Sequence, residues 1–240
     1  MKVTKKILVL AGGFGSRLKQ VVCDIPKPLA PVNDIPFLLH LIENYIRQGA
    51  REFIFLLHYE APLIQVLIDE ILTSNTFPDV KMTCIVEEKP LGTGGSVRNA
   101  VKILNLVESF IVVNADTWLG SGFEQLSLSS PNSIAAVRVK DCSRYGALVV
   151  IDGKIEQFLE KKSSYCSGLI NAGLYHLSPD IFNQVLGDTS FSLEADIFPS
   201  IVDRGMLSAI EINTDFIDIG VPEDYLRFCR WIESGKENEL

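Results

Sequence analysis

The sequence predicts an α/β protein whose mostly parallel sheet has helices on both faces. Three observations support this fold class. Strand-like and helix-like patterns alternate through the first half of the chain. Glycine-rich or acidic turns follow several of the apolar strands, as is typical where ligands bind beyond the carboxyl ends of parallel strands. The second half contains an Asp-Gly turn between two strand-like runs, which indicates a smaller β lobe.

In the first half of the chain, segments with the apolar pattern of a strand alternate regularly with segments that have the pattern of a helix. Its expected strands are 7–10, 52–57, 81–86 and 110–113, and its expected helices are 36–49, 62–72 and 94–104. The helix at 36–49 has apolar residues three and four positions apart and ends at Gly49, a common helix stop signal. Such alternation predicts a Rossmann-like three-layer sandwich.

The second half is richer in strands. A hairpin is expected from 145–151 and 154–158, followed by a strand at 170–177, a helix at 193–202 despite Pro199, and a strand at 216–219. Pro222, a residue favoured in the first helical turn, begins a final helix that extends to about 234. We find no low-complexity linker or repeat, so we expect one domain over 1–240.

Composition excludes several classes of protein. The 22 basic and 30 acidic residues give a net charge of −8 with no basic stripe, which argues against nucleic-acid binding. No apolar run is long enough to span a membrane, and the apolar N-terminal run is too short for a signal peptide. The five cysteines lack CxxC spacing, which favours buried reduced thiols and a cytoplasmic location over disulfides or zinc.

The most informative segment follows the first strand. Its glycines let backbone N–H groups approach an anion, and its arginine supplies a fork of donors that suits phosphate oxygens. Lys27 is held between two prolines by stiff backbone. These residues predict a polyphosphate site made of Ala11, Gly12, Gly13, Gly15, Ser16, Arg17 and Lys27.

Two better-known glycine loops do not fit this segment. The dinucleotide fingerprint requires a third glycine where Arg17 stands, and an acidic residue about 20 positions further on. The P-loop requires Gly-Lys-Ser/Thr after its intervening residues, and that sequence is absent here.

The pattern G-G-x-G-[ST]-R-L followed by x-P-K-P resembles the sugar-1-phosphate nucleotidylyltransferases. This resemblance implies a glycosyltransferase-A-like nucleotidyltransferase fold, with a nucleotide-binding part at about 1–130, a sugar-binding part at about 131–215 and a C-terminal helix at about 222–234. It also implies that Arg17 and Lys27 contact the phosphates of a nucleoside triphosphate.

Two aspartates end short apolar strands, Asp116 in N-x-D and Asp218 in D-x-G. Read alone, each could equally cap the next turn. Mg²⁺ commonly takes one or two carboxylates together with phosphate oxygens and waters. The resemblance implies that these two aspartates hold Mg²⁺, the expected cofactor.

A second glycine loop, Leu91 to Gly95, opens a helix and resembles the base-recognition loop of the family. Gly92, Thr93 and Gly94 are therefore expected to contact the base. Glu87 and Glu88 precede this loop. A carboxylate can accept from the two adjacent donors of guanine, whereas uracil and thymine place carbonyls beside their single N–H. This chemistry favours GTP, although paired surface glutamates are often only solvated.

The sugar-side motifs of the family also occur in order. The resemblance implies that Lys161 binds the phosphate of a sugar 1-phosphate and acts in catalysis together with Arg17 and Lys27. It implies sugar contacts from Tyr145, Gly146, Glu160, Asn171 and Glu194. Without the resemblance, Glu160 and Lys161 would equally suit a polar loop, and Glu194 a helix N-terminus.

The expected reaction is direct transfer of a nucleotidyl group from NTP to a sugar 1-phosphate, with release of pyrophosphate. Within the family, PKPLAPV, PLGTGG, SLEADIFP and IDIGVPEDY most resemble the D-glycero-D-manno-heptose 1-phosphate guanylyltransferases. One alternative is a sister enzyme that makes GDP-mannose or UDP-glucose, and another is a catalytically silent subunit that binds nucleotide-sugar. A homodimer is one option for the oligomeric state, which the sequence leaves open.

Overall fold

The computed structural model describes residues 5–14, 18, 22, 25–159, 167–185, 187 and 189–235. The chain forms two compact units. The first comprises Met1–Pro90, Val113–Ser121 and Asp215–Leu240, and the second comprises Leu91–Val112 and Gly122–Thr214. Strand β6 (Phe110–Asn114) crosses from one unit to the other along the chain.

The first unit is built on three parallel strands in the order β5–β4–β1. These are β1 (Ile7–Leu10), β4 (Glu52–Leu57) and β5 (Lys81–Val86). Leu10 pairs with Leu56, and Leu57 pairs with Val86, so the three strands end at the same edge. The residues of β1 and β4 are almost all buried, as expected for the near-continuous apolar runs of a parallel sheet.

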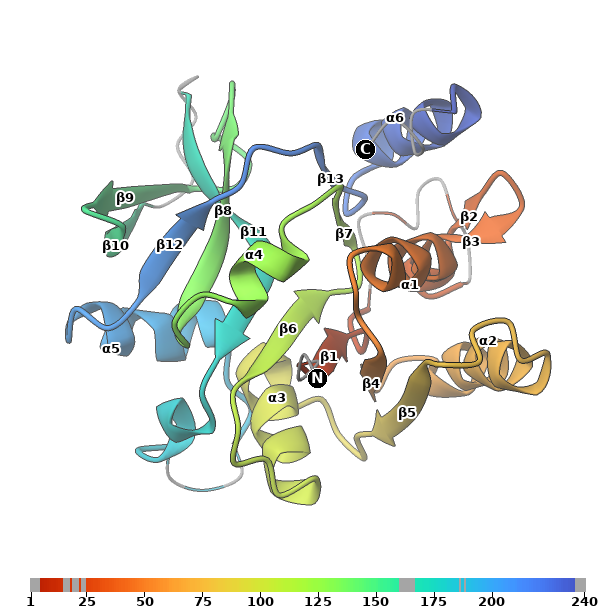
Figure 1. The fold of residues 1–240 in the computed structure, drawn as a ribbon, viewed down its shortest axis with the longest axis horizontal. Coiled ribbons are helices and arrows are strands. Elements are labelled where there is room, and N and C mark those ends of the chain that lie inside the picture. The colour runs from red at the N-terminus through yellow and green to blue at the C-terminus, as the bar shows by residue number, and fades with distance from the viewer. Residues whose placement is uncertain are drawn as a thin grey trace. The chain divides into compact units, whose positions relative to one another are not determined.

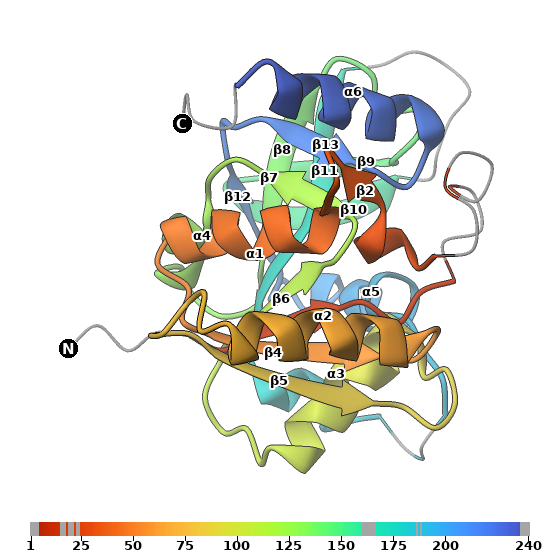
Figure 2. The same ribbon diagram turned by 90° about the vertical axis from the view of Figure 1, so that its right-hand side faces the viewer.

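Helices and short strands complete this unit (Figures 1 and 2). They are the 3₁₀ turn η2 (Lys27–Leu29), β2 (Pro31–Val32), β3 (Ile35–Pro36), α1 (Phe37–Arg47), α2 (Ala61–Thr73), β7 (Thr117–Leu119), β13 (Phe216–Asp218) and α6 (Pro222–Glu233). Helix α2 lies along β4 and β5, and α6 packs near β13 and β2. The rings of Phe37, Trp118, Phe228 and Trp231 pack together between α1, β7 and α6.

The second unit is richer in antiparallel pairs (Figure 1). Its strands are most of β6, with β8 (Ser133–Val139), β9 (Ala147–Ile151), β10 (Lys154–Leu159), β11 (Gly168–Leu177) and β12 (Ser208–Glu211). β8 pairs with β11 antiparallel and with β12 parallel, and β10 pairs with β12 and β9 antiparallel. The register of β11 shifts between Asn171 and Tyr175, so the strand is irregular between these two polar residues.

Its helices are short apart from α3 (Gly92–Ile103). The others are α4 (Phe123–Ser127), the 3₁₀ turn η3 (Pro179–Phe182), the π-turn η4 (Leu193–Ile197) and α5 (Phe198–Val202). The predicted helix at 193–202 is therefore divided between the π-helical segment η4 and the short α-helix α5. Pro199 is accommodated because it lies in the first turn of α5, where a missing N–H costs little.

The sequence did not reveal every element. Strands β7, β8 and β12 and helix α4 were not predicted. β7 and β12 are very short, and the polar end of β8 interrupts its apolar pattern. The predicted strands at 7–10, 52–57 and 81–86 are confirmed to the residue.

The cysteine prediction was wrong in one respect. Cys142, which is 2% exposed, is disulfide-bonded, whereas Cys84 and Cys229 are free thiols as expected. Sequence spacing does not reveal which cysteines approach within bonding distance once the chain is folded. Burial, with a smaller effect from the charge of Asp69, raises the pKa of the Cys84 thiol to about 11, which suits an unreactive structural cysteine.

Among the described residues, no helix is both long enough and apolar enough to cross a bilayer.

Candidate functional site

The first glycine loop begins where β1 ends, beside the end of β4. The N–H of Ala11 donates to the carbonyl of Leu56 at 3.0 Å, which continues the parallel pairing by one residue. An added Cβ on Gly12 would lie 3.1 Å from the backbone nitrogen of His58, so the close approach of these two backbones depends on glycine. Gly13 has no atom within 4 Å of such a position and is open.

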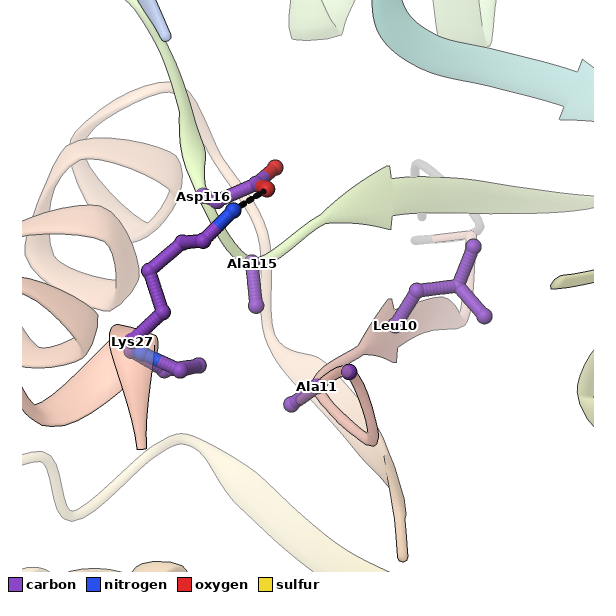
Figure 3. A pocket seen from close by; sticks show the side chains of 7 residues that line it. Leu10, Ala11, Lys27, Ala115 and Asp116 are labelled. Atoms are coloured by element: carbon purple, nitrogen blue, oxygen red, sulfur yellow. Dashed lines mark hydrogen bonds and ion pairs between the residues drawn. The ribbon is translucent and has the colours of Figure 1, made fainter. Parts of the chain in front are cut away.

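A pocket of about 60 Å³ lies at this strand end (Figure 3). Its lining residues are Leu10, Ala11, Gly13, Lys27, Pro28, Ala115 and Asp116. The ammonium group of Lys27 donates to Oδ2 of Asp116 at 2.7 Å, and the Lys27 side chain is only 12% exposed. The pocket therefore combines an open glycine backbone with one cation and one anion, which suits a phosphate and its counter-ion.

The two predicted metal aspartates are brought together by backbone pairing. β7 and β13 are antiparallel, with Asp218 opposite Thr117, and the N–H of Ile219 donates to the carbonyl of Asp116 at 3.0 Å. Asp116 and Asp218 thus lie at the same end of this two-stranded ribbon although they are far apart in sequence. In Asp116, Oδ2 accepts from Lys27 and Oδ1 accepts from the hydroxyl of Thr117 at 3.2 Å, and Oδ1 of Asp218 accepts from the N–H of Gly220 at 2.7 Å.

Gly220 lies in contact with both charged groups. A Cβ at this position would meet Oδ1 of Asp218 at 2.6 Å and the Nζ of Lys27 at 3.3 Å. Only a residue without a side chain leaves the carboxylate and the ammonium group where they are. The same geometry shows that the Lys27 ammonium lies close to the second aspartate as well as the first.

The two glutamates after β5 differ in their surroundings. Glu87 is buried, its N–H donates to the carbonyl of Leu57 at 2.8 Å, and its carbonyl lies 3.1 Å from Nδ1 of His58. Glu88 is exposed. Next to them the exposed Phe14 packs against the rings of His58 and Tyr59, with centroids 6.2 and 5.2 Å apart.

In the second unit, the glycine loop that opens α3 is packed against the chain itself. An added Cβ on Gly92 would lie 2.5 Å from the carbonyl oxygen of Phe191, and one on Gly94 would lie 2.4 Å from the ring of Phe191. The N–H groups of Gly94 and Gly95 both donate to that carbonyl, at 3.0 and 3.2 Å. These glycines are therefore required by internal packing, whatever their contact with a base.

Thr93, Glu194 and Asn171 belong to one hydrogen-bond network in this unit. The hydroxyl of Thr93 donates to Oε2 of Glu194 at 2.8 Å, and the hydroxyl of Tyr175 donates to Oε1 at 3.1 Å. Asn171 in turn donates from Nδ2 to the Tyr175 oxygen at 3.0 Å and accepts from the N–H of Gly173, also at 3.0 Å. The network joins the loop predicted to contact the base to the strand predicted to contact the sugar.

Tyr145 and Gly146 lie in the turn between β8 and β9. Their N–H groups both donate to the carbonyl of Cys142 at 3.0 Å, and Gly146 has a φ of +77° that favours glycine. The guanidinium of Arg144 lies 5.3 Å from the centre of the Tyr145 ring. The backbone of this turn is thus held by internal bonds.

The remaining predicted site residues, Gly15, Ser16, Arg17, Glu160 and Lys161, lie outside the described residues. Among the residues that the structure does describe, no group of three or more His, Cys, Asp or Glu side chains could hold a metal ion. The carboxylates of Asp116 and Asp218 therefore constitute the candidate metal site, with the carboxylate count that Mg²⁺ commonly uses.

Comparison with protein families identifies the chain. Residues 6–234 match the family model described as "Nucleotidyl transferase". This chain belongs to the nucleotidyl transferase family.

Two guanylyltransferases are similar in sequence to this chain over nearly its whole length. The chain is 35% identical over 222 residues to the D-glycero-alpha-D-manno-heptose 1-phosphate guanylyltransferase of Campylobacter jejuni, which covers 92% of this chain and 97% of the relative. It is 31% identical over 242 residues to the catalytic subunit beta of the mannose-1-phosphate guanylyltransferase of Danio rerio, which covers 97% of this chain and 66% of that longer relative.

A solved member of the family supports the fold. The crystal structure of HddC from Yersinia pseudotuberculosis, complexed with GMP-PN, is 37% identical and has a TM-score of 0.82 over 95% of this chain and 100% of HddC. The predicted fold class, a Rossmann-like α/β nucleotidyltransferase fold, is confirmed, and so are the predicted family and its enzymatic character as a sugar-1-phosphate nucleotidylyltransferase.

Two residues that the sequence analysis did not select belong to these clusters. Gly220 is the glycine of the D-x-G motif of the family, so the motif signalled the position but not its close approach to Lys27. Tyr175 ends INAGLY, one of the sugar-side motifs of the family, but that motif did not indicate a role for its side chain. Only the fold shows that its hydroxyl meets Glu194.

Proposed function

We propose that this protein transfers GMP from GTP to D-glycero-D-manno-heptose 1-phosphate, giving GDP-heptose and pyrophosphate. The observation that carries the proposal is the cluster of Lys27, Asp116, Asp218 and Gly220 beside an open glycine loop. Family membership and similarity to a heptose 1-phosphate guanylyltransferase over nearly the whole of both chains support it.

The nucleotide phosphates would bind at the loop after β1. The proposal assigns the open backbone at Gly13 and the ammonium of Lys27 to the phosphates, together with Ala11, Gly12, Gly15, Ser16 and Arg17 from the family resemblance. A charge-assisted hydrogen bond from a partly buried lysine is well suited to a phosphoryl oxygen whose negative charge grows during the reaction.

Asp116 and Asp218 would hold Mg²⁺, because hard oxygen ligands in a pair are what this ion prefers. When bound, the ion would neutralise charge on the triphosphate. Lys27 and the Thr117 hydroxyl hold the oxygens of Asp116, and the Gly220 N–H holds Oδ1 of Asp218, so both carboxylates are oriented before ligands arrive.

The reaction would be a direct displacement. A phosphate oxygen of the sugar 1-phosphate attacks the α-phosphorus of GTP, a new P–O bond forms, and the bond to the pyrophosphate leaving group breaks. No covalent intermediate on the protein is required, because alignment and charge neutralisation lower the barrier. The proposal assigns Lys161 to the attacking phosphate, Lys27 to the α-phosphoryl group and Arg17 to the departing pyrophosphate.

The choice of base and sugar is supported by chemistry and by relatives. Glu87 and Glu88 are proposed to accept from N1–H and the 2-amino group of guanine, and Gly92, Thr93 and Gly94 are proposed to contact the base. The solved relative HddC is complexed with GMP-PN. The sugar would be bound by Tyr145, Gly146, Glu160 and Asn171, which were predicted from the sequence. We propose a cytoplasmic location because nucleoside triphosphates are cytoplasmic metabolites.

A pyrophosphate-release assay tests the proposal. GTP, UTP, CTP, ATP and dTTP are each combined with heptose, mannose and glucose 1-phosphates in the presence of Mg²⁺. We expect the largest kcat/KM for GTP with the heptose phosphate, and none without Mg²⁺. Asp116→Asn should lower kcat/KM roughly a hundredfold, equivalent to about 3 kcal/mol. Asp152→Asn, in the exposed hairpin turn, should leave it unchanged.

Other outcomes would redirect the proposal. A preference for mannose 1-phosphate with GTP would make the protein a mannose-1-phosphate guanylyltransferase, the function of its relative in Danio rerio. Folded protein that releases no pyrophosphate from any pair would instead indicate a catalytically silent subunit.

A further inference from the structure

The carboxylate of Glu194 is surrounded by hydroxyl groups of the protein itself. Oε2 accepts from Thr93 and from Ser192, both at 2.8 Å, and Oε1 accepts from Tyr175 at 3.1 Å. An ionised carboxylate has about four acceptor positions, so internal donors take most of them before any substrate binds. This occupancy differs from that expected of a carboxylate whose main partners are sugar hydroxyls.

One arm of the network reaches the loop that opens α3. The Thr93 hydroxyl donates to Glu194 and also accepts from the N–H of Leu193 at 2.9 Å. Both hydrogen-bonding functions of this side chain are therefore used inside the protein. The following N–H groups, those of Gly94 and Gly95, donate to Phe191, two residues before Leu193. Hence the loop is attached to the 191–194 segment by side chain and backbone together.

The other arm reaches β11. Tyr175 is fully buried, and its oxygen accepts from Nδ2 of Asn171 while its hydrogen is donated to Glu194. The Asn171 carbonyl oxygen is held by the N–H of Gly173, where the strand is irregular. The orientation of Asn171 is thus determined through Tyr175 by the same carboxylate that holds Thr93.

The position of the carboxylate is itself determined by the π-turn η4. The hydroxyl of Ser192 accepts from the N–H groups of Glu194 and Ala195, at 3.1 and 3.2 Å, and donates to the Glu194 side chain. This N-terminal cap fixes both the backbone and the side chain of Glu194. Hydroxyl bonds to an ionised acceptor are stronger than bonds between neutral groups, so the network is stiff.

We propose that Glu194 is a positioning residue that holds the nucleobase loop and the sugar-binding strand in register, rather than a ligand of the sugar. The assignment of these two elements to base and sugar rests on the proposed function. Thr93 acts on the nucleotide side through the backbone of its loop. Tyr175 acts on the sugar side through Asn171. Glu194 serves both substrates because both arms end on it.

Three substitutions separate this proposal from direct sugar binding. Thr93→Val should raise KM for the nucleotide about three- to tenfold and leave that for the sugar phosphate unchanged, since it breaks one arm. Tyr175→Phe should raise KM for the sugar phosphate and leave that for the nucleotide unchanged. Glu194→Gln should raise both KM values, with a smaller change in kcat. Asp196→Asn changes an exposed carboxylate of the same turn that accepts from the Ser192 N–H, and should alter neither KM.

The KM values that each substitution changes distinguish a positioning role for Glu194 from direct sugar binding. If Glu194→Gln raises only KM for the sugar phosphate, the carboxylate is a sugar ligand and the proposal is overturned. Additive effects of Thr93→Val and Glu194→Gln in the double variant would overturn it too, because residues of one network are coupled.

The kinetic test uses whichever substrate pair the wild-type protein turns over, so a wrong base or sugar does not affect it. Hydrogen exchange of the unliganded variants gives a second readout. Glu194→Gln should speed exchange at Gly94 and Gly95 in the loop that opens α3, and at Gly173 in β11. Unchanged exchange in both the loop and the strand would overturn the proposal. An inactive wild type with this exchange pattern would count against the proposed function alone.

Discussion

At the scale of single residues, the Lys27 ammonium group is bonded to an oxygen that a divalent ion would also use. Its distance from Oδ2 of Asp116 is 2.7 Å, and Gly220 places it near Asp218 as well. In the proposed site, this ammonium group would compete with a metal ion until phosphate oxygens bound the lysine instead. The binding of nucleotide and the binding of metal should therefore favour each other, because such coupling is reciprocal.

We predict that Lys27→Met binds Mn²⁺ more tightly than the wild type does when no nucleotide is present, roughly tenfold, equivalent to about 1.4 kcal/mol. Isothermal titration or electron paramagnetic resonance measures this affinity directly. Lys6→Met is the matched control, since Lys6 pairs with Glu52 just before β1 rather than beyond its end. Weaker or unchanged Mn²⁺ binding by Lys27→Met would show that the ammonium does not compete.

Gly220 provides a second prediction at this scale. Gly220→Ala should lower kcat/KM roughly a hundredfold, about 3 kcal/mol, because the new methyl group would displace the Asp218 carboxylate or the Lys27 ammonium. Steady-state kinetics measures the loss, and circular dichroism checks that the fold is retained.

Gly168→Ala in β11 is the control for this change. Its added Cβ would meet Ala147 and Cys142 at 3.5 and 3.6 Å, which are ordinary contacts, so activity should be retained. Equal activity of the two variants would mean that Gly220 does not set the geometry of the acidic pair.

At the scale of elements, α6 is anchored by one aromatic side chain. Phe228 is fully buried, with ring centres of Phe37 and Trp118 both at 5.1 Å and that of Trp231 at 5.7 Å. Helix α6 follows β13, which contains Asp218, and β7 contains Trp118. Packing around Phe228 therefore supports the β7–β13 ribbon, which brings Asp116 and Asp218 to the same end.

We predict that Phe228→Ala lowers the free energy of unfolding by about 3–5 kcal/mol, the usual cost of removing a buried phenyl ring. Urea denaturation measures it. Leu226→Ala, on the same helix but 44% exposed, should cost less than about 1 kcal/mol. If the two variants are equally stable, the aromatic cluster does not anchor the helix.

Local patterns predicted the elements well but not the contacts between them. The strand at 52–57 is apolar from Phe53 to Leu57 and lies between Arg51 and His58, so its limits could be read directly. The pairing of Asp218 with Thr117 joins segments that are distant in sequence, and no local pattern encodes such a register. The positions of Asp116 and Asp218 at the ends of short strands, together with the family resemblance, brought them into the same hypothesis.

The Glu194 network illustrates the same limit. The sequence analysis placed Thr93 with the base and Glu194 with the sugar, because each belongs to a separate motif. That the two side chains bond to each other at 2.8 Å depends on the path of the chain from α3 to η4. Hydrogen bonds between side chains are set by the tertiary fold, so spacing along the sequence does not report them.

At the scale of the whole molecule, the two units are interleaved in sequence. The chain passes between them after Pro90, Val112, Ser121 and Thr214, and one strand, β6, contributes residues to both. We predict that they unfold together as a single domain, as the sequence suggested, because melting either unit would release segments that the other requires. Calorimetry should show one transition with equal calorimetric and van't Hoff enthalpies. Two resolved transitions would indicate two domains.

The antiparallel pairing of β7 with β13 also bears on how the protein is made. Asp116 leaves the ribosome long before Asp218, and translation proceeds at roughly 5–20 residues per second. During that interval a nascent chain contains Asp116 but not yet Asp218. A truncated product that stops before β13 would keep the parallel strands of the first unit and the lysine of η2, yet could not assemble the acidic pair. On the proposed function, the site for a divalent ion would thus form only after β13 has been synthesised.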